Sequence, residues 1–84
     1  MFNKNYESNN SIGNNIRKWR QLKGFKQDNF ANQIGISKST LSKIENDRQG
    51  IGVLRLQLIA SCLKIKATDL FKNPNDLLSP PLSD

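Results

Sequence analysis

The stretch QDNFANQIGISKSTLSKIEN, from Gln27 to Asn46, decides the fold of this chain. Two helices joined by a tight turn touch near their corner, so the first needs a small residue there, and Ala31 supplies it. The turn needs a residue that tolerates a left-handed backbone, and Gly35 follows four positions later. Ser37 is a favourable N-cap for the second helix. The stretch therefore predicts two short helices joined by a tight turn.

Apolar side chains of this stretch indicate which faces of the two helices are buried. The first helix is expected near residues 26–33, and the second after Ser37, ending near Asn46. Placing Leu41 and Ile44 inward, at about 100° per residue, turns the polar side chains of the second helix to the opposite face. The side chains that point into the corner and the core are Phe30, Ile34, Ile36, Leu41 and Ile44. Those on the opposite face are Ser39, Ser42, Lys43 and Asn46, flanked by Lys38 and Thr40, and none of them is acidic.

The segments around this motif also carry apolar residues at helical spacing, and none alternates with period two. A helix is expected near residues 12–23, where Gly24 can end it. Another is expected over residues 53–63, and a short fifth over residues 67–72. The sequence therefore predicts an all-α fold, a compact five-helix bundle that contains a helix-turn-helix.

The two ends of the chain differ from the middle in composition. Residues 1–11 are rich in Asn and have no period, which predicts a flexible N-terminal arm. Residues 73–84 contain Pro74, Pro80 and Pro81, which forbid a continuous helix and predict a flexible C-terminal tail. The helix-turn-helix domain is expected between them, over residues 12–72.

Composition narrows the classes of function. Thirteen Lys and Arg against seven Asp and Glu give a net charge of +6, which favours a polyanionic partner. The chain has no histidine and a single cysteine, Cys62, so we expect no enzyme activity, no metal site and no cofactor. No apolar run approaches the ~20 residues that span a bilayer, and the start lacks a signal peptide. We therefore expect a cytoplasmic protein without a membrane partner. We also expect no small-molecule partner, because the sequence predicts no second domain to hold a ligand.

With these residues in view, the chain resembles the lambda-repressor-like, or Xre, family of phage and bacterial regulators. The blocks that carry the resemblance are IGNNIRKWR (12–20), FKQDNFANQIGIS (25–37), LSKIEN (41–46) and IASCLKIKATDLF (59–71). The resemblance implies a sequence-specific regulator of transcription that binds double-stranded DNA and places the helix near residues 37–46 in the major groove. Carried over by position, Lys38, Ser39 and Lys43 are the first candidates for reading base edges, and Thr40 and Ser42 are secondary candidates.

The resemblance also implies roles for residues outside that helix. Gln27 would bind a phosphate, with its neighbour Lys26 on one side of the motif. The loop after the second helix would meet the DNA backbone on the other side, through Asn46, Arg48 and Gln49. Arg20 and Glu45 are expected to form an ion pair across the core that holds the helix near residues 37–46 against the helix near residues 12–23.

Three positions depart from the family pattern. Asp47 stands where glycine is common, which places an acid near the expected DNA backbone. Lys64 replaces a glycine after the helix over residues 53–63, so that helix is expected to end in a different geometry. Lys66 replaces the Ser or Thr that normally caps the short fifth helix.

Leu54 and Leu58 point outward, one turn apart, if the other apolar residues of their helix face inward. They suggest the seam of a homodimer, or a surface that receives the leucines of the tail. Two alternative functions stay open at this point. One is an antitoxin that binds its own operator and also a toxin protein. The other is a protein-interaction module without DNA binding, for which Asp47 is the only support.

Overall fold

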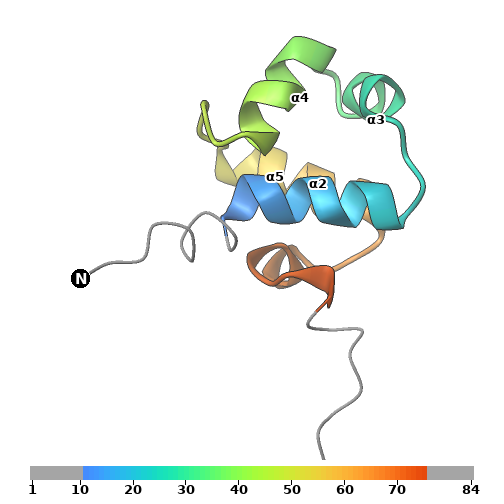
Figure 1. Ribbon diagram of the computed structural model, residues 1–84, viewed down its shortest axis with the longest axis vertical. Helices are drawn as coiled ribbons and strands as arrows, with labels where there is room; N and C mark the ends of the chain where they lie inside the picture. Colours follow the sequence, from blue (N-terminus) through green and yellow to red (C-terminus); the bar gives the residue numbers. More distant parts are fainter. Residues whose placement is uncertain (1–10, 76–84) are drawn as a thin grey trace, which may run out of the picture.

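The computed structural model describes residues 11–75, and these residues form a helical fold without strands. Helix α2 spans Ile12–Leu22, α3 Gln27–Gln33, α4 Lys38–Glu45 and α5 Val53–Leu63, and a 3-10 helix, η1, spans Ala67–Phe71. Figure 1 shows α2 crossing the middle of the molecule, with α3 and α4 on one side of it and η1 on the other. The prediction of an all-α fold with a helix-turn-helix is confirmed, and the helix-turn-helix consists of α3 and α4.

The prediction of a fifth α-helix over residues 67–72 is wrong: residues 11–75 contain four α-helices, and the segment Ala67–Phe71 is a 3-10 helix. The backbone bonds from the Asp69 N–H to the Lys66 carbonyl, 2.9 Å, and from the Lys72 N–H to the Asp69 carbonyl, 3.1 Å, have 3-10 spacing. Side chains of α2 bind carbonyls of this segment: the Asn15 amide donates to Leu70, 3.1 Å, and the Trp19 indole N–H donates to Asp69, 3.1 Å. A five-residue segment is short for an α-helix, and these bonds to α2 hold it in the tighter form.

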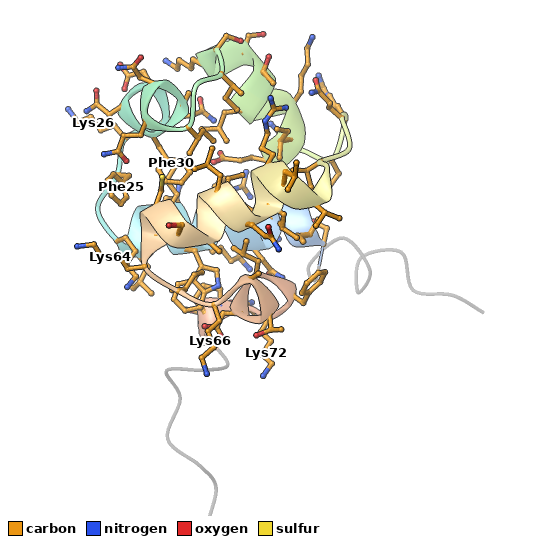
Figure 2. All side chains as sticks on the ribbon, turned by 180° about the vertical axis from the view of Figure 1, so that it is seen from behind. Phe25, Lys26, Phe30, Lys64, Lys66 and Lys72 are labelled. Carbon is orange, nitrogen blue, oxygen red and sulfur yellow. The ribbon has the colours of Figure 1, made fainter. Side chains whose placement is uncertain are left out.

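The core lies where α2 meets the other elements. Ile16 of α2 and Phe30 of α3 are completely buried, and so are side chains from every other element of the domain. Phe25, in the loop before α3, packs against Phe30 with 5.3 Å between ring centroids, as Figure 2 shows beside α3. The remaining fully buried aliphatic residues are Leu41, Ile44, Ile59, Leu63 and Leu70.

Each of the four α-helices in the described part of the chain is followed by a residue with left-handed backbone. Gly24 after α2 and Gly35 after α3 have this left-handed conformation, with φ of 83° and 76°. Asp47 and Lys64 do it after α4 and α5, with φ of 60° and 59°. The prediction that Lys64 forces a different helix end is therefore wrong. The chain keeps the geometry of a glycine at both sites, although a side chain there costs about 1–2 kcal/mol.

The predicted arm and tail fall mostly outside the described residues, namely residues 1–10 and 76–84. Of the few positions inside, the Ser11 hydroxyl accepts a hydrogen bond from the Asn14 N–H at 3.1 Å and caps α2. Pro74 is fully buried. The limits of the domain at residues 12 and 72 stay predictions. No helix within residues 11–75 is long and apolar enough to cross a membrane.

Gly13 is where α2 and the end of α4 come closest. A Cβ atom at Gly13 would overlap the Ile44 carbonyl oxygen and the Asp47 carboxylate. We therefore expect Gly13→Ala to lower the free energy of unfolding by about 1–3 kcal/mol, as measured by urea denaturation. Gly50→Ala is the matched control, because nothing lies within 4 Å of a Cβ there. Equal stability of the two variants would contradict the close approach of α2 and α4.

Candidate nucleic-acid interface

Helix α4 presents the polar face that the sequence predicts. Leu41 and Ile44 are buried, whereas Lys38, Ser39 and Lys43 are exposed. Thr40 and Ser42 are half-buried on the flanks of this face. The structure thus brings all five candidate base-reading residues together on one helix. The only acid of α4, Glu45, is buried, so the exposed face of the helix carries two lysines and no carboxylate.

Polar side chains close both ends of α4. The Ser37 hydroxyl accepts from the Thr40 N–H at 3.0 Å and donates to the Thr40 hydroxyl oxygen at 2.9 Å. At the other end the Asn46 amide donates to the Ser42 carbonyl at 2.8 Å. Asn46, a candidate for phosphate binding, thus uses an amide N–H within its own helix. These bonds fix the two ends of the exposed face.

The other candidate phosphate-binding residues lie on both sides of α4. Lys26 precedes α3, and Arg48 and Gln49 follow α4, and all three are exposed. Asp47 is also exposed in the same loop, with its carboxylate over the first turn of α2 near Gly13. Gln27, the first residue of α3, is half-buried, and its amide donates to the Glu45 carboxylate at 3.0 Å.

Arg20 and Glu45 form a buried, two-pronged ion pair. Arg20 Nε lies 2.7 Å from Glu45 Oε2, and Arg20 Nη2 lies 3.2 Å from Oε1. The third guanidinium nitrogen, Nη1, donates to the Phe25 carbonyl at 2.8 Å. The Glu45 side chain is fully shielded from solvent. This pair joins α2, the loop before α3, and the last residue of α4, so it fixes α4 against the rest of the domain.

Sequence reasoning missed several residues that build this surface. The hydrogen bond from Gln27 to Glu45 has no sequence signal, since either residue alone resembles a solvated side chain. Gly13 and Asn15 were not singled out, although a glycine and a buried asparagine within an apolar helical stripe are unusual. Asn15 also has a buried side-chain oxygen without a hydrogen-bond partner in the described part of the chain.

Residues that could hold a metal ion are not grouped in this structure. Within residues 11–75 no cluster of three His, Cys, Asp or Glu side chains is present, and Cys62 is a free, half-buried thiol.

Comparison with known proteins places the chain in a family. The sequence pattern of the helix-turn-helix family matches residues 16–70. The HTH-type transcriptional regulator YazB of Bacillus subtilis is 40% identical over 58 residues, which cover 69% of this chain and 84% of YazB. The control protein C.MunI of a Mycoplasma species is 32% identical over 63 residues, or 74% of this chain and 85% of C.MunI.

A solved structure agrees with these matches. The crystal structure of SinR, the master regulator for biofilm formation, in complex with DNA superposes on this structure with a TM-score of 0.68 and 28% sequence identity. The match covers 74% of this chain and all of the SinR chain. SinR comes from Bacillus subtilis. The chain therefore belongs to the helix-turn-helix family, in its Xre or lambda-repressor-like branch. This is a family of DNA-binding transcriptional regulators and not of enzymes.

The buried ion pair leads to a test of stability. Arg20→Met leaves the Glu45 carboxylate buried without its cation, so we expect a loss of about 3–5 kcal/mol in the free energy of unfolding. The double variant Arg20→Met, Glu45→Met removes both charges and should recover much of this loss. Arg17→Met is the control, because Arg17 is half-buried and its side chain, among residues 11–75, binds Asn14 of its own helix, at 2.8 Å, and no acid. Urea denaturation measures the free energy of unfolding of all three variants. A double variant no more stable than Arg20→Met would refute this account.

Proposed function

We propose that this protein binds double-stranded DNA at a specific sequence, with α4 in the major groove, and thereby regulates transcription. The observation that carries the proposal is the exposed, acid-free face of α4, which the Arg20–Glu45 pair fixes against the rest of the domain. Lys38, Ser39 and Lys43 would meet base edges, with Thr40 and Ser42 beside them. The bacterial relatives, a transcriptional regulator and a control protein, support a protein that acts on DNA. Such a protein would work in the cytoplasm, where bacterial DNA lies, and the proposed activity needs no cofactor.

Phosphate contacts on both sides of α4 would supply affinity and register. Lys26 and Gln27 flank it at the start of α3, and Arg48 and Gln49 flank it in the loop after α4. Each phosphate that a cation neutralises releases counterions, so the binding constant should fall as salt rises. Asp47 opposes these contacts, and the loop is therefore expected to contribute less than its arginine alone suggests.

The first test defines the preferred sequence by selection from a random DNA pool and then compares that duplex with a scrambled one. For the double variant Lys38→Ala, Lys43→Ala we expect the preference for the selected duplex over the scrambled one to fall by about tenfold or more, because base contacts are lost. The dependence of binding on salt should also become shallower. Fluorescence anisotropy at several salt concentrations measures both quantities.

The control for this test is Lys66→Ala, Lys72→Ala, which removes the same charge from a distant surface. Both lysines are exposed, and Figure 2 shows them at the end of the molecule opposite α4. This variant should keep the sequence preference of the wild-type protein. If instead the α4 variant kept its preference, the proposed placement of α4 in the groove would be wrong.

Helix α5 carries an apolar surface that supports a homodimer. Leu54 is 81% exposed, Val53 69% and Leu58 44%, and these residues line a shallow hollow with Ile34, the residue that follows α3. Such a surface is costly to leave in water on a small domain. Two copies joined here would present two α4 helices to a two-fold operator, with half-sites about one DNA turn apart. An antitoxin would instead place a toxin protein on the same leucines.

Sedimentation of the purified chain distinguishes these assemblies, since a homodimer needs no second protein. We expect Leu58→Glu to shift the dimer towards monomer and to weaken operator binding by at least tenfold, because it buries a charge at the seam. Leu22→Glu is the matched control, since Leu22 is 49% exposed on α2 and does not line the hollow. An unchanged mass and affinity for Leu58→Glu would rule out the homodimer at this surface.

A further inference from the structure

The 3-10 form of η1 sorts the side chains of this segment, and of the residues that cap it, onto three faces. A 3-10 helix has three residues per turn, so side chains three positions apart lie one above the other. The inner face is that of Leu70, which is fully buried. The two outer faces carry Lys66, Asp69 and Lys72 on one and Thr68 and Phe71 on the other. In an α-helix, Lys66 and Lys72 would instead point about 120° apart.

One of these outer faces is cationic. Lys66 and Lys72 are exposed, and Figure 2 shows both at the end of the molecule opposite α4. The Asp69 carboxylate between them is half-buried and accepts a hydrogen bond from the Lys66 backbone N–H at 3.1 Å. The one ion pair within residues 11–75 joins α2 to α4, so neither lysine is paired with a described acid. Lys64, two residues before Lys66, is also exposed, and the described part of this end is therefore positive.

The other outer face adds an aromatic ring to this charge. Phe71 is 58% exposed and directly precedes Lys72. The sugar-phosphate backbone of DNA binds cations but offers little apolar surface to such a ring. A second copy of this chain would bring its own lysines against these, and like charges repel. A protein segment that carries both carboxylates and apolar side chains suits the lysines and the ring together.

Two buried side chains of α2 hold η1 in place. The Asn15 amide donates to the Leu70 carbonyl at 3.1 Å. The Trp19 indole N–H donates to the carbonyls of Asp69, at 3.1 Å, and of Lys72, at 3.4 Å. Because these bonds fix the backbone of η1, its outer faces are formed before any partner arrives, and binding there costs little ordering of the backbone.

We propose that Lys66, Phe71 and Lys72 form a docking surface, the η1 surface, for an acidic amphipathic segment of another protein. The η1 surface lies at the end of the molecule opposite α4, so a partner bound there leaves α4 free for DNA. The inference goes beyond the proposed function and does not depend on it. A regulator built in this way holds DNA at one end and a second protein at the other.

The test measures how the full chain binds a labelled synthetic peptide built from Glu, Leu and Ser, by fluorescence anisotropy. For Lys66→Ala, Lys72→Ala we expect about fivefold weaker binding or more, because two charge contacts are lost. The matched control Lys38→Ala, Lys43→Ala removes the same charge from α4 and should change binding by less than about twofold. Phe71→Ser should weaken binding by about fivefold, and so should replacing every Leu of the peptide by Ser.

The only tryptophan of the chain gives an independent readout. Trp19 is bound to the backbone of η1, so a peptide on the η1 surface should change its fluorescence emission. The change should appear in the wild-type protein and in Lys38→Ala, Lys43→Ala. At the same peptide concentration it should be absent from Lys66→Ala, Lys72→Ala.

Several results would overturn the inference. If both double variants lose peptide binding equally, the attraction is that of the overall charge. If the peptide without Leu binds as well as the original, Phe71 has no part in docking. If the scrambled duplex loses more affinity for Lys66→Ala, Lys72→Ala than for the α4 variant, the occupant of the η1 surface is DNA.

The acidic tail of this chain is a further candidate occupant. In the full chain, Asp76→Asn, Asp84→Asn removes two of its charges, and peptide binding should stay within about twofold of wild type. A tenfold gain in peptide binding would make the tail the occupant and overturn the external partner. A wild-type protein without preference for any DNA sequence would refute the proposed function, and the peptide result would still stand.

Discussion

The buried pair of Arg20 and Glu45 is the interaction on which the rest of this structure depends. It joins the central helix α2 to the end of α4, and its third nitrogen holds the loop that leads into α3. Such a pair adds little net stability, because desolvation offsets most of the attraction. Its contribution is geometric: two parallel hydrogen bonds allow one orientation of the two helices. It also neutralises the only acid of α4, so that the exposed side of the helix stays positive.

Close packing around this pair depends on small features of the backbone. Gly13 lets α2 approach the end of α4, and a left-handed residue follows each of the helices α2, α3, α4 and α5. Asp47 and Lys64 hold this conformation without being glycines, so the geometry of each helix end is set by its hydrogen bonds and by packing. The Arg48 N–H to the Lys43 carbonyl, 2.8 Å, and the Ile65 N–H to the Ala60 carbonyl, 3.0 Å, are the bonds that do this.

The exposed surfaces of α4 and α5 differ in their chemistry, and so do their proposed partners. The face of α4 offers lysines and hydroxyls, which suit phosphates and base edges. The start of α5 offers Val53, Leu54 and Leu58, which suit a second apolar surface. A small domain that combines both can place two recognition helices at a fixed spacing on DNA. In the proposed homodimer, the Arg20–Glu45 pair would fix α4 within each copy, and the apolar surface of α5 would join the two copies.

The sequence by itself determined the positions of helices α2 to α5, the corner between α3 and α4 and the polar face of α4. These follow from local spacing and from single residues such as Gly35 and Ser37. The pairing of Arg20 with Glu45 came only through the family resemblance. The 3-10 form of η1, the approach at Gly13 and the bond from Gln27 to Glu45 were decided by the tertiary structure. Each depends on how distant segments are placed against one another, and helical periodicity reports which side of a helix is buried but not which partner it meets.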